Sequence, residues 1–123
     1  MSIDVNAVNV ESSVRFLAAT VEGTQLLDAE KTVHFLDGSS GAVDATLGAG
    51  INDGQWIQLV CVDATNSVAV SLDTSNNVLC VDAAGNDLSL LSFGVKGQSL
   101  QLVWHAASSR WFTTFGGYSG TVE

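Results

Sequence analysis

Apolar and polar residues alternate along most of this chain in short runs, with a period of two. Val43-Asp44-Ala45-Thr46-Leu47 is the clearest example, because an extended backbone places its apolar side chains on one face. Residues 14–21 also fit a short helix, but their length and strand-rich surroundings favour a strand. Further strands are predicted at 31–36, 56–62, 68–72, 78–81 and 88–93. We expect no significant helix, because no segment carries convincing helical amphipathicity.

Residues 97–117 have the pattern of a β-hairpin bounded by glycines, with a polar loop at 106–109. A loop at this place makes Trp104 face Trp111. The other predicted pairs are His105 with Arg110, Val103 with Phe112, Leu102 with Thr113 and Leu100 with Phe115. Facing aromatic and aliphatic side chains of this kind stabilise a sheet by roughly 0.2–1 kcal/mol per pair.

One internal repeat is present, between residues 54–61 and 97–104. Both copies read Gly-Gln-x-(Ile/Leu)-Gln-Leu-Val. A single repeat does not establish a solenoid, which needs three or more units. We expect two equivalent hairpins, one in each sheet of a sandwich, with each glycine ending the preceding turn. The glutamines should face solvent or form hydrogen bonds at a strand edge.

The combined patterns predict an all-β fold, an antiparallel β-sandwich or jelly-roll-like barrel of about 8–10 short strands. The chain has 123 residues, which is enough for one domain with a substantial core. We expect an extended N-terminal arm at 1–13 and a single β domain at 14–123. With 12 glycines and no proline, the turns must depend on Gly, Asn, Asp and Ser.

The charge balance disfavours two classes of partner. Four Lys and Arg stand against 13 Asp and Glu, which gives a formal net charge of −9. Nucleic acids and anionic membranes are bound through clustered cations, so we expect neither as a partner. The chain contains no apolar run of about 18 residues, so we expect no membrane span. The first residues do not resemble a signal peptide, so we expect synthesis in the cytoplasm.

Residues that could carry catalysis or bind metals are sparse. His34 and His105 are the only histidines, and both lie in strand patterns without a nucleophile motif nearby. Cys61 and Cys80 lack the spacing of zinc ligands, and their apolar neighbours favour buried free thiols. A disulfide between them is the alternative if their strands are adjacent. The acidic turns match no calcium loop. We therefore predict neither an enzyme nor a cofactor nor a metal site.

The aromatic residues of the strands are the remaining candidates for a functional surface. Trp56, Trp104 and Trp111 lie among apolar neighbours, where tryptophans usually pack in a core or at a subunit interface. We assign the same role to Phe112 and Phe115. The alternative is a lectin-like site in which a tryptophan stacks on a sugar.

The order of motifs along residues 33–117 is distinctive. An alternating strand ends in Thr46-Leu47, Asp53-Gly54-Gln55 and an apolar strand follow, and Leu-x-Leu-x-Trp at 100–104 precedes a second tryptophan, Trp111. This order resembles small β-rich structural proteins of tailed bacteriophages. Those proteins include capsid decoration (cement) proteins, head fibres and the ends of tail fibres.

The resemblance implies a homotrimer that stabilises the outer surface of a phage head, with the major capsid protein as its partner. In this interpretation the N-terminal arm grips the capsid through its apolar residues, which are Ile3, Val5, Val8 and Val10. The protein would be made in the host cytoplasm and end on the virion. The alternative function is a carbohydrate- or receptor-binding tip of a phage fibre.

Overall fold

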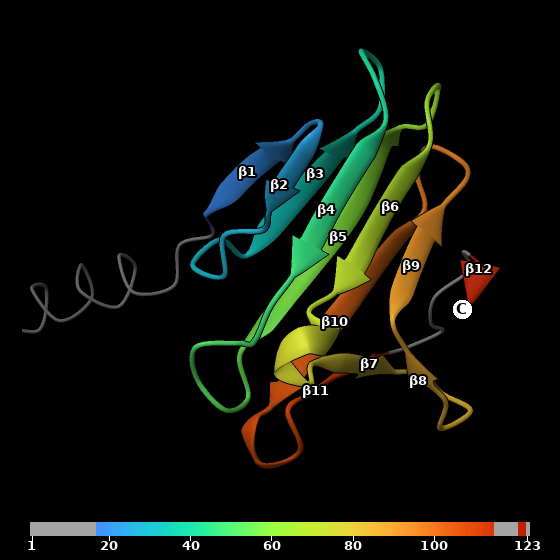
Figure 1. Cartoon of the computed structure of the whole chain (residues 1–123). Helices are drawn as coiled ribbons and strands as arrows, with labels where there is room; N and C mark the ends of the chain where they lie inside the picture. Colours follow the sequence, from blue (N-terminus) through green and yellow to red (C-terminus); the bar gives the residue numbers. More distant parts are fainter. Residues whose placement is uncertain (1–16, 115–120, 123) are drawn as a thin grey trace, which may run out of the picture.

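A computed structural model describes residues 17–114 and 121–122, which form two β-sheets (Figure 1). Sheet A has the strand order β1 (Ala18–Val21), β3 (Val33–Asp37), β5 (Trp56–Asp63), β10 (Ser99–His105), β11 (Arg110–Thr113), β7 (Leu79–Val81) and β8 (Asp87–Leu88). Sheet B has the order β12 (Thr121–Val122), β9 (Leu90–Phe93), β6 (Val68–Leu72), β4 (Val43–Leu47) and β2 (Thr24–Leu26). In Figure 1, β4, β6 and β9 lie in front of β5 and β10.

The all-β class is confirmed. The helical segments within the described residues are two three-residue 3₁₀ turns, η1 (Thr74–Asn76) and η2 (Ala106–Ser108). The described residues form twelve strands, more than the 8–10 expected, because the short strands β2, β8 and β12 carry little periodicity. The arm predicted at 1–13 lies outside the described residues.

The prediction of purely antiparallel sheets is wrong, because both sheets are mixed. From β1 to β6 the chain changes sheet at every turn, so β1, β3 and β5 run parallel in sheet A. In the same way β2, β4 and β6 run parallel in sheet B. The alternation within a strand shows which face is buried, but not whether the next strand lies beside it or opposite it. Antiparallel pairing begins with β5–β10 and β6–β9.

The predicted hairpin register is confirmed from Leu102–Thr113 to His105–Arg110. The η2 turn forms the loop, and Ser109 closes it with a left-handed backbone (φ 55°). The pair that included Phe115 lies outside the described residues.

The core lies between the two sheets and is built from their inward-facing residues. Its members are buried aliphatic, thiol and indole side chains: Val21, Leu27, Leu36, Val43, Ala45, Leu47, Ile57, Leu59, Cys61, Val68, Val70, Leu72, Val78, Cys80, Leu88, Leu91, Phe93, Leu100, Leu102, Trp104 and Trp111. Such burial stabilises the fold by roughly 25 cal/mol per Å² of apolar surface.

The two core tryptophans close one end of the sandwich under the loop that follows β4. Their ring centroids are 5.1 Å apart, and the Trp111 Nε1–H donates a hydrogen bond to the Gly48 carbonyl oxygen (2.9 Å). A Cβ at position 50 would lie 2.4 Å from the Trp104 Cγ, so only glycine fits there. Gly50 therefore allows the loop backbone to pack against the Trp104 indole.

Candidate interaction surface

The sequence repeat forms the centre of sheet A. The prediction that its two copies lie in different sheets is wrong: β5 and β10 are neighbours and run antiparallel. Gln58 pairs with Gln101, which is its own counterpart in the repeat. The two strands are therefore related by a local two-fold axis that passes between these glutamines.

The hydrogen bonds of the two copies obey the same local symmetry. The Gly54 N–H donates to the Trp104 carbonyl oxygen (2.8 Å), and the Gly97 N–H donates to the Cys61 carbonyl oxygen (2.7 Å). Both glycines have positive φ, 85° and 98°, as expected for residues that end tight turns. The shared motif thus encodes one local structure that is used twice.

The first glutamine of each motif closes its turn. The Gln55 Oε1 accepts hydrogen bonds from the backbone N–H groups of Ile51 and Asn52. The Gln98 Oε1 accepts the equivalent bonds from Gly94 and Val95. The second glutamines, Gln58 and Gln101, instead lie half-buried on the outer face of the sheet.

The outer face of sheet A is strongly apolar. Cross-strand pairing aligns Trp56 with Val103, Val103 with Phe112, and Phe112 with Val81, so four neighbouring strands contribute to one row. We call these four residues the apolar row. On the other side of the glutamine pair, Phe35 lies beside Val60. The exposed fractions of Trp56, Phe35 and Phe112 are 36%, 37% and 39%, which are large for aromatic side chains.

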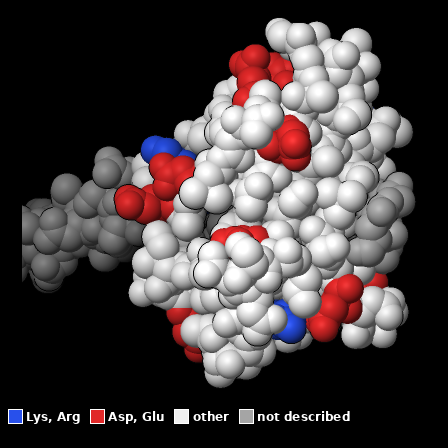
Figure 2. Space-filling view, in the orientation of Figure 1, with Lys and Arg blue, Asp and Glu red and all other residues white. Residues whose placement is uncertain are grey.

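The outer face of sheet B has a different character. Its two central strands place Asp44, Thr46, Ala69 and Ser71 on this face; Asp44 is exposed and the other three are half-buried. Leu26 and Leu90 lie on the strands that flank them. Figure 2 views the molecule from this side and shows acidic side chains spaced apart, with uncharged surface between them. This face is typical of a sheet that remains in water.

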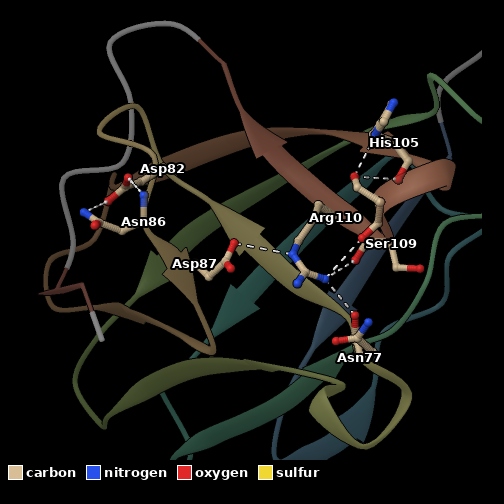
Figure 3. Close-up of polar contacts among 8 residues, drawn as sticks. Asn77, Asp82, Asn86, Asp87, His105, Ser109 and Arg110 are labelled. Atoms are coloured by element: carbon tan, nitrogen blue, oxygen red, sulfur yellow. Dashed lines mark hydrogen bonds and ion pairs between the residues drawn. The ribbon is translucent and has the colours of Figure 1, made fainter.

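An ion pair links β11, an inner strand of sheet A, to the edge strand β8. Arg110 forms an ion pair with Asp87, with 3.4 Å between Nε and Oδ1, and donates from Nη1 to the Asn77 carbonyl oxygen (2.9 Å). Figure 3 shows this guanidinium directed at both groups. It also shows the neighbouring turn in which the Asp82 carboxylate accepts a hydrogen bond from the Asn86 N–H. These contacts hold the edge of the sheet, while the apolar row itself carries no charge.

A shallow hollow of about 370 Å³ lies beside the apolar row. Its lining residues are Asp53, Gly54, Val103, Trp104, His105 and Phe112. The rings of His105 and Phe112 meet edge to face at 5.9 Å. The Asp53 Oδ1 accepts a hydrogen bond from the Ala106 N–H (2.9 Å), which fixes its carboxylate at the rim. The hollow can accommodate an apolar group that carries a donor or a positive charge.

The opposite end of the β5–β10 pair, which the local two-fold axis relates to this hollow, carries different charged side chains. Lys96 replaces Asp53 in the second copy of the repeat, and Asp63 occupies the place that corresponds to Ala106. The pKa of Asp63 is held below its usual value, chiefly by the hydrogen bond from the Thr65 N–H and to a smaller degree by Lys96. The two copies of the repeat therefore have the same backbone geometry but different charges. One copy has the carboxylate of Asp53, and the other has the ammonium group of Lys96 near the carboxylate of Asp63.

The buried titratable groups are part of the core. His34 is fully buried, its Nε2–H donates to the Lys31 carbonyl oxygen (3.1 Å), and burial lowers its pKa. Cys61 and Cys80 are free thiols, as favoured from the sequence, because β10 and β11 separate their strands. Burial raises the pKa of Cys80 to about 12.

No group of three or more His, Cys, Asp or Glu in residues 17–114 is arranged to hold a metal ion. No helix in that range is long and apolar enough to cross a membrane.

The predicted aromatic residues fall into three places. Trp104 and Trp111 lie in the core, whereas Trp56 and Phe112 lie on the outer face of sheet A. The remaining candidates lie outside the described residues: Ile3, Val5, Val8, Val10 and Phe115. Phe35 and Val60 were not singled out, although their strands contain apolar residues at both alternating positions, which indicates two apolar faces.

The sequence was compared with protein-family models and with curated proteins. No protein-family model matches the chain, and no curated protein is significantly similar to it.

Proposed function

We propose that this chain is a structural protein of a tailed-bacteriophage virion, which attaches as a homotrimer to the outer surface of the head. The observation that carries the proposal is the apolar outer face of sheet A, on a chain whose net charge is −9. A continuous apolar surface of this kind marks a protein–protein contact in a soluble protein. The order of sequence motifs supports the virion as its setting.

Stabilisation of the shell would come from added buried area. Each oligomer would contact neighbouring copies of the major capsid protein and so link them. Lasting attachment needs an interface of more than about 1,000 Å² in total. The acidic remainder of the surface would stay in solvent and keep decorated particles apart through like-charge repulsion.

Reconstitution on capsids tests this proposal. Undecorated heads of the virus that encodes the chain are mixed with purified protein, pelleted, and imaged by cryo-electron microscopy. We expect symmetric density on the outer surface and saturable co-sedimentation. Deletion of residues 1–12 should abolish attachment and leave the oligomer intact, and attachment of the shortened chain would disprove the role of the arm. Failure of the intact chain to bind heads would disprove the decoration function.

A carbohydrate-binding fibre tip is the second candidate, and the hollow beside the apolar row favours it. Phe112 offers a partly exposed ring there, with Asp53 and His105 as polar neighbours. Trp104 and Trp111 cannot stack on a sugar, because they are buried. A glycan array distinguishes the candidates: sugar binding that is lost in both Asp53→Asn and Phe112→Ala would favour the fibre tip.

A further inference from the structure

We propose that the outer face of sheet A is covered by a second copy of this chain. The inference rests on the self-association in the proposed function, and it is independent of attachment to a capsid. It assigns the subunit contact to the apolar row and to the band formed by Phe35 and Val60.

The outer faces of the two sheets differ in their apolar content. Sheet strands alternate, so a sandwich in water needs apolar residues only on the inner side of each sheet. Sheet B follows this rule in its two central strands, which place the polar residues Thr46 and Ser71 on the outer face. Sheet A departs from it across four consecutive strands, where Trp56, Val103, Phe112 and Val81 are direct neighbours.

The distribution of charge favours this face over the rest of the surface for contact between identical chains. Each copy carries a net charge of −9, so most orientations bring acidic groups together. The apolar row and the Phe35–Val60 band contain no ionisable residue. Arg110, which begins the inner strand β11, is neutralised by Asp87 of the edge strand β8. The apolar bands of two copies can therefore meet without bringing like charges into direct contact.

The outer face of sheet A also has a banded pattern. An apolar band lies on each side of the amide pair formed by Gln58 and Gln101. Equivalent residues approach one another near the axis of a symmetric oligomer, so apolar bands can meet apolar bands and amides can meet amides. A glutamine amide has both donors and an acceptor, and it can therefore pair with its own copy. A central amide of this kind fixes register, as a buried asparagine does in coiled coils.

The available area is sufficient for a specific contact. From β1 to β7 the face spans five strand spacings, about 24 Å, and its longer strands extend over about 20 Å. The projected area is roughly 500 Å² per copy, which reaches the total of about 1,000 Å² that specific interfaces require. Side chains that protrude from the face add to this area.

Sedimentation equilibrium of matched charge variants tests the inference. The variant Trp56→Glu/Phe112→Glu places two charges on sheet A, and the control Thr46→Glu/Ser71→Glu places the same charges on sheet B. We expect the wild type and the control to sediment as a multiple of 12.8 kDa, and the sheet A variant to sediment at 12.8 kDa. Loss of one hot-spot side chain weakens association by about 30-fold.

Folding is checked by near-ultraviolet circular dichroism, which reports the buried Trp104–Trp111 pair. The milder variant Val103→Thr changes shape little and should weaken association even if the glutamate variant fails to fold. An oligomer that survives Val103→Thr unchanged, or the sheet A glutamates in a folded chain, overturns the inference and leaves the decoration function intact. A monomeric wild type whose capsid binding is lost in the sheet A variant also overturns it, since the capsid protein would then cover the face.

Discussion

The two sheets of this protein have similar inner faces and different outer faces. Inside, both present aliphatic side chains to a shared core, such as Leu59 from sheet A and Val70 from sheet B. Outside, the centre of sheet B presents Thr46 and Ser71, whereas sheet A presents Trp56, Val103 and Phe112.

This difference separates the requirements of folding from those of binding. Folding requires one apolar face per sheet, and sheet B meets that requirement with an outer surface suited to water. The second apolar face of sheet A adds nothing to the core. We propose that a contact with another protein surface accounts for it, and the uncharged, banded pattern of its apolar rows fits another copy of the same chain.

The largest effect is expected from a change inside sheet A. Leu102→Ala removes a fully buried side chain from β10 and should lower the free energy of unfolding by about 2–5 kcal/mol. Val103→Ala, one residue later on the outer face, should cost less than about 1 kcal/mol in the dissociated chain. Urea unfolding at low protein concentration measures both. Equal losses would show that both faces of β10 belong to the folding core.

A smaller loss is expected where the loop covers the core tryptophans. Gly50→Ala places a Cβ against the Trp104 ring and should cost about 1–3 kcal/mol, as overpacking does elsewhere. Gly41→Ala is the matched control, because its Cβ would meet nothing within 4 Å and its φ is not positive. Thermal unfolding compares the two, and equal melting temperatures would contradict the close contact at position 50.

The inner face of sheet A also holds a titratable group, which predicts a pH effect. His34 has a lowered pKa, chiefly because it is buried, while its bond to the Lys31 carbonyl and the charge of Asp28 act in the opposite direction. Above about pH 6.5 the imidazole is neutral in both states and contributes nothing. Below that pH the unfolded chain takes up a proton that the folded chain resists. The unfolding free energy should then fall by up to about 1.4 kcal/mol per pH unit until the folded pKa is reached.

The variant His34→Gln isolates this contribution. Its unfolding free energy should change less than that of the wild type between about pH 7 and about pH 5. Asp63, Asp73 and Asp82 act at lower pH, because hydrogen bonds from Thr65, Asn76 and Asn86 hold their pKa values below the usual range. An identical pH dependence in both chains would show that His34 is accessible to protons in the fold.

The smallest effect on stability is expected on sheet B. Thr46→Val and Ser71→Val together make the centre of its outer face resemble that of sheet A, and should change the unfolding free energy by about 0.5 kcal/mol or less. The new apolar surface should raise the sedimentation mass or reduce solubility. A loss of several kcal/mol would show that these side chains support the fold.

The sequence predicted what is local and missed what depends on partner strands. Facing pairs of the last hairpin, including Trp104 with Trp111, were predicted because one short loop fixes their register. The alternation of β1 to β6 between sheets was missed, since parallel pairing depends on contacts distant in sequence. Phe35 was missed as a surface residue because only the pairing of β3 with β5 joins it to Val60.

Tryptophan quenching by acrylamide tests most directly which face is covered. Trp104 and Trp111 are buried in the core, so quenchable emission reports Trp56 on the outer face of sheet A. A Ser71→Trp chain that also carries Trp56→Phe reports sheet B in the same way. The account predicts that quenching of Trp56 decreases as protein concentration rises through association, while quenching of the sheet B reporter stays constant. Quenching of Trp56 that remains unchanged while the sedimentation mass increases would contradict it.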